Sequence, residues 1–307
     1  MDRLVAMQTF VRVAELGSFS KAAEGLKLPN ATVSTRIAQL EEHLQVKLLS
    51  RTTRRVSLTE DGAAYLERVQ RLLNDLLEIE AQLAGAAHSP RGRLRVDVPA
   101  AAGRHVLAPA LPDFCARYPQ IVLDIGSGDR PVDLLAEGVD CVIRGGFTHD
   151  DTLVARALGA FDVVTCAAPS YLARRGTPTT PQALHAHACV NFFSAKSGRV
   201  FPFEFERGGE KIEILGPHQV AANDADTYVE AGLAGLRILQ SPRTRRLQAL
   251  IDGGRLVPVL TDWSGGQLPM YAMYLRNRHL SARVRVFVDW VVQLYADTFA
   301  ELGAAAS

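Results

Sequence analysis

Apolar residues near the start of the chain recur at the spacing of two short amphipathic helices. One stripe runs from Leu4 to Ala14, and the other runs from Phe19 to Leu26. Gly17 and Ser18 lie between the stripes, where glycine can end one helix and serine can cap the next. The pattern therefore predicts two helices joined by a tight turn.

A third helix and a hairpin are predicted to follow. After the break at Pro29, Asn30 is placed to cap a helix, whose apolar stripe is Val33, Ile37, Leu40 and Leu44. Two short apolar runs, 46–49 and 56–58, then bracket a cationic stretch. This pattern predicts a hairpin, here called the wing, whose basic residues are Arg51, Arg54 and Arg55.

Residues 60–86 contain no proline and carry a narrow apolar stripe with heptad spacing. The stripe consists of Tyr65, Val69, Leu72, Leu76, Ile79 and Leu83. A long helix with such a narrow stripe favours pairing with a second copy, although the stripe is also compatible with packing on the helix's own domain. We expect a dimerisation helix here, followed by a hinge near Ser89–Gly92.

From residue 93 onward, strand-like runs alternate with helical stripes, which predicts βαβ units and mainly parallel sheets. An alternating pair, 200–206 and 211–215, surrounds Gly208 and Gly209 and predicts one antiparallel hairpin. The region holds more than two hundred residues, enough to bury a sizeable core.

Composition adds little until it is divided by segment. The chain has 307 residues, 48% of them hydrophobic, and a net charge of +1. Residues 1–59 contain nine basic and five acidic residues, whereas residues 60–90 contain two basic and six acidic ones. A head of net charge +4 precedes a helix of net charge −4, and a basic head favours a polyanionic partner.

The sequence gives no support to an enzyme or a metal site. The histidines show no HExxH spacing, no serine lies in a GxSxG motif, and neither a P-loop nor a GxGxxG motif follows a strand. Four widely spaced cysteines without a CxxC pair are interpreted as buried thiols. No signal peptide or long apolar segment occurs, so we expect a cytoplasmic protein with no cofactor, no catalytic activity and no membrane partner.

Three short helices followed by a basic hairpin are typical of a winged helix-turn-helix, whose third helix enters the major groove of DNA. Asn30 and Ser34 can hydrogen-bond to base edges, and the methyl groups of Ala31 and Thr35 can meet thymine. The wing arginines would lie beside phosphates. A plain helical subdomain with a solvated basic face is the alternative.

Three segments closely resemble the DNA-binding region of LysR-type transcriptional regulators: 17–26 (GSFSKAAEGL), 31–44 (ATVSTRIAQLEEHL) and 48–62 (LLSRTTRRVSLTEDG). The similarity is dense over the first 62 residues and weaker but continuous beyond them. Thr35 stands where the family often has arginine, and Arg36 is expected to supply that missing charge. The family's linker helix pairs two subunits, which would place two heads on half-sites about 34 Å apart.

The resemblance implies an α+β multidomain chain: a winged helix-turn-helix domain, a linker helix, and an α/β effector domain of periplasmic-binding-protein type with two subdomains. The expected boundaries are 1–59 for the DNA-binding domain, 60–90 for the linker helix and hinge, and 91–307 for the effector domain. Subdomain I is placed at about 93–165 plus 269–300, and subdomain II at about 166–268.

An effector is expected between the subdomains, where strand ends and helix N-termini converge. The candidate residues are Ala100, Ala101, Ser127, Arg144, Phe193, Ser194 and Asn223. The strand-end loops and the helix start after Asp224 are suited to an anionic group, and Arg144 to a carboxylate. The alternatives are that Ser127 and Asn223 are turn or capping residues and that Arg144 forms a structural ion pair.

We therefore expect a homodimeric or homotetrameric DNA-binding regulator that responds to a small molecule. One alternative is a regulator that acts without an effector. Another is a cytoplasmic α/β binding protein whose helical head serves only as a dimerisation arm.

Overall fold

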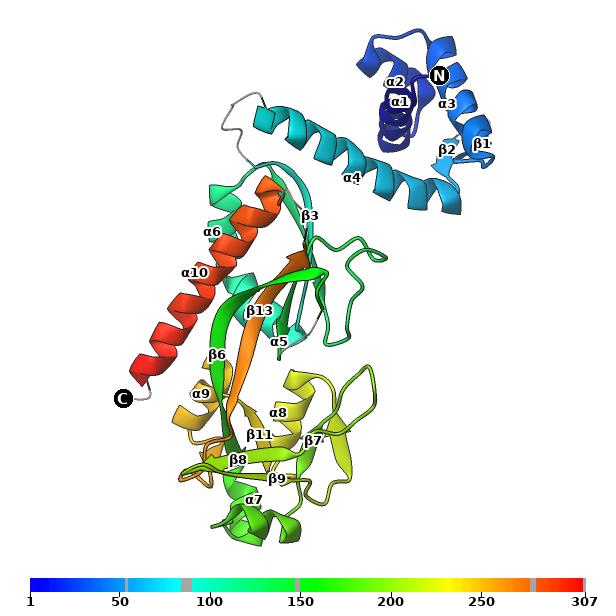
Figure 1. Cartoon of the computed structure of the whole chain (residues 1–307). Helices are drawn as coiled ribbons and strands as arrows, with labels where there is room; N and C mark the ends of the chain where they lie inside the picture. The colour runs from blue at the N-terminus through cyan, green and yellow to red at the C-terminus, as the bar shows by residue number, and fades with distance from the viewer. Residues whose placement is uncertain (53–54, 84–89, 147–149, 277–279, 306–307) are drawn as a thin grey trace. The chain divides into compact units, whose positions relative to one another are not determined.

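The chain forms two compact units, Met1–His88 and Ser89–Ser307. The computed structural model describes residues 1–52, 55–83, 90–146, 150–276 and 280–305 (Figure 1). Within the described residues no helix is long and apolar enough to cross a membrane.

Unit 1 begins with the three predicted helices, α1 (Arg3–Leu16), α2 (Phe19–Leu26) and α3 (Asn30–Leu44). Gly17 ends α1 with a φ of 57°, and the Ser18 side chain caps α2 by accepting the Lys21 N–H. These two predictions are confirmed.

The predicted cap of α3 is wrong by one residue. Pro29 is the N-cap and its ψ of 142° is extended, so Asn30 is already the first helical residue. Proline fixes its own φ and provides no side-chain cap, which leaves the Asn30 side chain free to bind elsewhere. The Asn30 amide donates to the Ser20 hydroxyl at 3.0 Å and so joins the start of α3 to α2.

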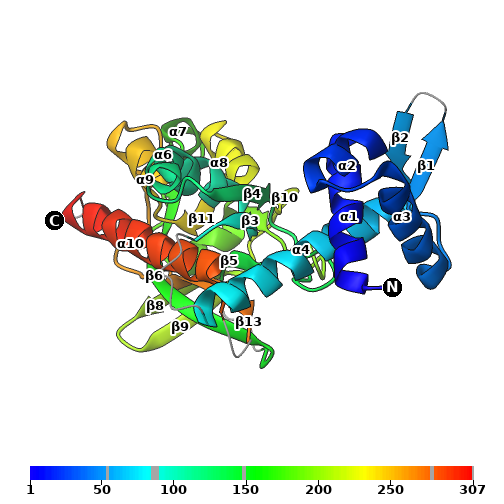
Figure 2. The same cartoon turned by 90° about the horizontal axis from the view of Figure 1, so that it is seen from above.

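The wing is an antiparallel hairpin of β1 (Leu49–Thr52) and β2 (Arg55–Leu58), which projects from the helical body (Figure 2). Helix α4 (Glu60–Leu83) follows. Thr59 joins the two elements, because its hydroxyl donates to the Lys47 carbonyl at 2.6 Å and accepts the Gly62 N–H at 2.9 Å. The core of this unit includes Phe10, Val33, Ile37 and Leu48, each no more than 1% exposed.

Unit 2 contains a seven-stranded sheet in the order β11-β6-β13-β5-β3-β4, with β12 paired to β6. Its strands are β3 (Gly92–Val98), β4 (Ile121–Ser127), β5 (Cys141–Gly145), β6 (Leu153–Ala167), β11 (Leu239–Pro242), β12 (Val257–Pro258) and β13 (Gln267–Leu275). A small parallel sheet joins β7 (Val190–Phe192) to β10 (Val220–Ala222), and the predicted hairpin is β8 (Phe203–Arg207) with β9 (Glu210–Ile214).

The prediction of mainly parallel sheets is wrong for the large sheet. Strand β3 is parallel to β4 and β5, but β13 is antiparallel to β5 and β6, and β6 is antiparallel to β11 and β12. The reason is the connection between the two halves of the unit. Strand β6 leaves the first half and β13 returns to it, so the two long strands run in opposite directions (Figure 1).

The helices of unit 2 cover the sheets. They are α5 (Ala100–Ala102), the π-helix η1 (Gly103–Leu107), α6 (Ala108–Arg117), α7 (Pro169–Arg175), the 3-10 helix η2 (Pro181–Ala186), α8 (Ala225–Leu233), α9 (Arg245–Asp252) and α10 (Ala282–Ala305). One core joins β3, β5, α6 and α10 and includes Phe114 and Phe287, whose rings meet edge to face at 5.8 Å. Separate cores lie around Tyr171 and around Tyr228 in the other half.

Candidate nucleic-acid interface and effector site

The first turns of α3 present a polar surface opposite a buried apolar one. Asn30, Ala31 and Thr35 are exposed, whereas Val33 and Ile37 are fully buried. Ser34 and Arg36 are partly buried at the edge between the two faces. The structure therefore places Ala31 and Thr35 opposite the core. Asn30 is exposed at the helix start, and Ser34 and Arg36 lie on the two flanks of the exposed face.

The wing arginines are only partly described. Arg51 and Arg55 lie in β1 and β2, where Arg51 is opposite Val56 and Arg55 is opposite Thr52. Arg54 lies outside the described residues.

Sequence reasoning missed Glu41, which anchors the wing to α3. Its side chain is 5% exposed, and its carboxylate accepts the N–H groups of Leu48 and Leu49 at 2.9 and 3.1 Å. Lys47 donates to the other oxygen at 2.8 Å. Burial raises the pKa of this carboxyl, but the hydrogen bonds from Lys47, Leu49 and Leu48 outweigh it and the pKa is lowered. Its position in the sequence could have indicated its burial, because Glu41 lies one turn after Ile37 on the buried face of α3.

The predicted apolar stripe of α4, here called the seam, divides into two parts. Tyr65 packs against Phe10 with ring centroids 5.6 Å apart, and Val69 is 4% exposed, so both are engaged within their own domain. Leu72, by contrast, is 52% exposed, and Leu76 is partly buried. The side chains of Ile79 and Leu83 lie outside the described residues. Among the seam residues whose side chains are described, Leu72 is thus the most open to a second copy.

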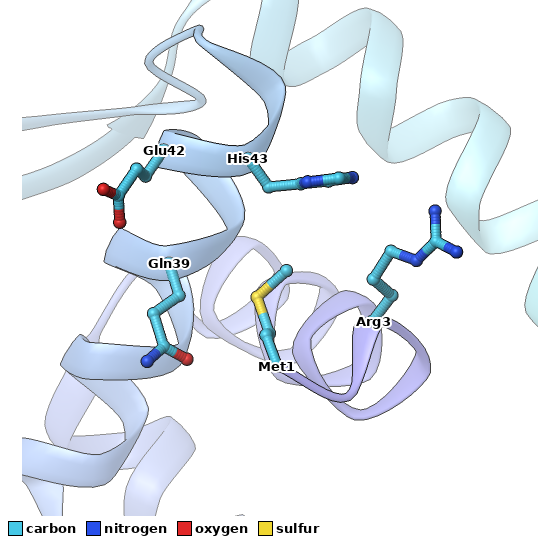
Figure 3. A pocket seen from close by; sticks show the side chains of 5 residues that line it. All are labelled: Met1, Arg3, Gln39, Glu42 and His43. Carbon is cyan, nitrogen blue, oxygen red and sulfur yellow. The ribbon is translucent and has the colours of Figure 1, made fainter.

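An open depression lies on unit 1 between the start of α1 and the end of α3 (Figure 3). Its lining consists of Met1, Arg3, Gln39, Glu42 and His43. None of these is a sequence-predicted site residue. The depression lies at the opposite end of α3 from Asn30, so it is separate from the predicted base-contacting turn.

In unit 2 several predicted effector residues converge where α5 lies beside α8. Ala100 and Ala101 form the start of α5, and Asn223 lies just before α8. Ser127 ends β4 next to Gly103, where a Cβ on that glycine would be 3.0 Å from the Ser127 hydroxyl. Phe193 and Ser194 are farther along the small sheet, where the Phe193 N–H donates to the Ala222 carbonyl at 3.0 Å.

Two features of this junction differ from the anion site that was expected. The amides of Ala100 and Ala225 face the carboxylate of Asp129, a residue of this chain. Arg144 pairs with Asp97, and its guanidinium also donates to the carbonyls of Asp97, Ile143 and Arg130. For Arg144 the structure therefore shows the structural ion pair that was the alternative.

One cysteine prediction also needs correction. Cys141, Cys166 and Cys189 are buried, and burial raises the pKa of each thiol, to about 12, 12 and 11. Cys115 is exposed, because α6 turns the neighbouring Phe114 into the core. Within the described residues, no group of three or more metal-ligating side chains is present.

Residues 4–63 match the family model of bacterial regulatory helix-turn-helix proteins of the lysR family, and residues 87–296 match the LysR substrate binding domain. The chain belongs to the LysR family of transcriptional regulators. The expected fold class, with a helix-turn-helix domain before a two-subdomain effector domain, is confirmed.

The family's regulators resemble this chain along almost all of its length. An HTH-type transcriptional repressor of Pseudomonas aeruginosa is 42% identical over 97% of this chain and 93% of its own. The HTH-type transcriptional activator AaeR of Escherichia coli is 32% identical over 99% of this chain and 96% of its own. Relatives of this LysR regulator thus include both a repressor and an activator.

Two solved full-length structures show a similar fold. CrgA, a LysR-type transcriptional regulator from Neisseria meningitidis, matches with a TM-score of 0.58 and 33% identity over 94% of this chain and 98% of its own. The Vibrio cholerae virulence activator AphB matches with a TM-score of 0.59 and 27% identity over 94% and 98%.

Proposed function

We propose that this LysR regulator reads its operator with the first turns of α3. The observation that carries the proposal is the exposure of Ala31 and Thr35 on the face opposite the buried Val33 and Ile37, with Asn30 exposed at the start of the helix. Side chains at the N-terminal end of such a helix reach base edges when it enters the major groove. Ser34 and Arg36, at the edge of this surface, extend the contact.

The wing and the linker helix supply affinity and symmetry in this proposal. Arg51, Arg54 and Arg55 contact phosphates, which strengthens binding to all sequences alike. Pairing through α4, with Leu72 exposed on it, joins two heads so that the second binds at a high effective concentration. The regulator then acts as a homodimer or homotetramer on an approximately symmetric operator.

The effector domain is proposed to sense a small molecule at the junction of α5 and α8. Binding that differs between two subunit arrangements would shift their populations and change the spacing of the heads on DNA. In this account the protein acts in the cytoplasm, without a cofactor and without catalysing a reaction.

An effector-independent regulator is the second candidate, and Asp129 is the observation that favours it. Its carboxylate faces the amides of Ala100 and Ala225, which an anionic effector would otherwise meet. Calorimetric titration of the full chain with fractionated metabolite extracts separates the candidates. Saturable heat from any fraction supports an effector, and persistent absence of heat supports the second candidate.

Selection of bound fragments from random DNA tests the proposed operator reading. We expect the parent chain to enrich one approximately palindromic motif with half-sites about one helical turn apart. Ser34→Ala should enrich an altered motif, whereas the exposed Glu42→Gln, at the far end of α3, should enrich the parent motif. Enrichment of no motif by the parent chain would refute sequence-specific reading.

A further inference from the structure

Asp226 makes contacts across the junction between the two subdomains of the effector domain. It lies in the first turn of α8, and its side chain is only 11% exposed. Arg104 donates to its carboxylate, and His105 Nε2 lies 3.1 Å from its Oδ1. Both of these residues belong to η1, on the other side of the junction. Subdomain II thus supplies a nearly buried carboxylate that is bound by two side chains of subdomain I.

Asp129 lies at the same junction. It follows β4 of subdomain I, and its carboxylate faces the amide of Ala100 on its own side and the amide of Ala225 at the start of α8. Burial and the charge of Asp224 raise the pKa of this carboxyl, against the effect of the two amides and Arg144. One of its carboxylate oxygens, Oδ2, is buried without a hydrogen-bond partner among the described residues.

The surrounding helices position the groups that bind Asp226. η1 is a π-helix between α5 and α6, and such local widening of a helix changes the direction of its side chains. The consecutive residues Arg104 and His105 both reach Asp226 from this turn. Arg246 of α9 binds the same carboxylate from within subdomain II, so three cationic or polar groups converge on it.

We propose that the contacts of Asp226 with Arg104 and His105 form a clamp that holds the two subdomains together in the absence of an effector. Separation of the subdomains would take Arg104 and His105 away from Asp226 and leave it with Arg246. Opening therefore loses two contacts of a nearly buried carboxylate unless another ligand replaces them. The inference rests on the proposed function in one respect: an effector entering between α5 and α8 would have to displace or rearrange the clamp. The resting state of the sensor is then closed.

Distances between spin labels on the full chain test the clamp directly. The exposed Cys115 on α6 supplies one label and Ala173→Cys on α7 supplies the other, and the remaining cysteines are buried. Dilution with unlabelled Cys115→Ser chain suppresses distances between subunits. Without effector or DNA we expect one narrow distance for the parent, and a longer, broader distribution for Asp226→Asn and Arg104→Gln.

Arg104→Gln keeps the test decisive if an aspartate variant fails to fold, because the Arg104 side chain is 64% exposed. Arg93→Gln is its matched control, since Arg93 is 57% exposed and pairs with Asp124 inside subdomain I. The control should retain the parent distance. A parent-like distribution for Arg104→Gln and for a folded Asp226→Asn would overturn the clamp. Because no ligand is present, that result would leave effector binding itself to the calorimetric test.

Discussion

The backbone N–H of Leu48, at the base of the wing, donates to the buried carboxylate of Glu41 on α3 at 2.9 Å. This bond fixes where the wing leaves the helix that is proposed to read DNA. The arginines of the wing and the exposed turn of α3 can therefore act on one duplex only while this carboxylate is in place.

Replacement of Glu41 should destabilise the DNA-binding domain. Glu41→Ala leaves the N–H groups of Leu48 and Leu49 without their acceptor in a buried site, which costs about 1–3 kcal/mol for an unsatisfied group. Denaturant unfolding of the parent and variant measures the loss. The neighbouring Glu42 is exposed, so Glu42→Ala serves as the control and should change stability by less than about 0.5 kcal/mol.

The same residue gives a predicted pH dependence. Folding lowers the pKa of Glu41, so its charge stabilises the folded state above the ordinary carboxyl pKa of about 4.3, and this contribution is lost as pH falls through the folded value. The stability gap between the parent and Glu41→Gln should therefore narrow on acidification from pH 7 to pH 3. A gap that widened over this range would show that the pKa shift has the opposite sign.

Gly62 should not tolerate a side chain. A Cβ at this position of α4 would lie 1.9 Å from the Leu48 carbonyl oxygen, a backbone atom that cannot move without displacing β1. We expect Gly62→Ala to cost at least the roughly 1–3 kcal/mol typical of overpacking. Gly25→Ala in α2 is the matched control, because its Cβ would meet only Arg12 at 3.5 Å and alanine favours a helix by up to about 1 kcal/mol. The melting temperature should fall for Gly62→Ala and rise for Gly25→Ala, as measured by thermal unfolding.

The two halves of the α4 seam should respond differently to substitution. Leu72→Glu places a charge on an exposed position and should weaken self-association while leaving the melting temperature of the DNA-binding domain nearly unchanged. Val69→Ala truncates a side chain that is 4% exposed and should instead lower stability, by about 1–3 kcal/mol. Sedimentation across a concentration series, combined with calorimetry, separates the effects. Association of Leu72→Glu equal to that of the parent would place the dimer contact elsewhere.

The wing and α3 should differ in how they affect DNA binding. Arg54→Ala should weaken binding to every sequence and reduce the salt slope of binding by about one per subunit. Ser34→Ala should leave the salt slope near its parent value and change base preference. Fluorescence anisotropy over a salt series, on two duplexes of different sequence, measures both. An unchanged slope for Arg54→Ala would contradict phosphate contact by the wing.

Much of the head could be predicted because its signals are local. Apolar spacing, Gly17 and Ser18 indicated the helices and their junction, and the short runs around the arginines indicated the wing. The prediction that Asn30 caps α3 was wrong because Pro29 already supplies the extended backbone before the helix. Glu41 was missed because a carboxylate is buried only when distant backbone groups, here Leu48 and Leu49, arrive to bind it.

The effector domain was harder to predict because its features depend on long-range pairing. Strand direction was misjudged since nothing local in β6 or β13 shows that the chain crosses between the subdomains and returns. The convergence at α5 and α8 was anticipated from strand ends. The position of Asp129 beside the amide of Ala225 was not predicted, because the two residues are distant in sequence.

Titration of the full chain with its selected operator, beside a scrambled duplex of the same composition, tests the central claim most directly. At near-physiological salt a sequence-specific regulator binds its site about 10³-fold or more tightly than unrelated DNA. We predict a difference of at least this order for the parent chain, and its reduction by Ser34→Ala. Equal affinity for the two duplexes would contradict the account that α3 reads a defined operator.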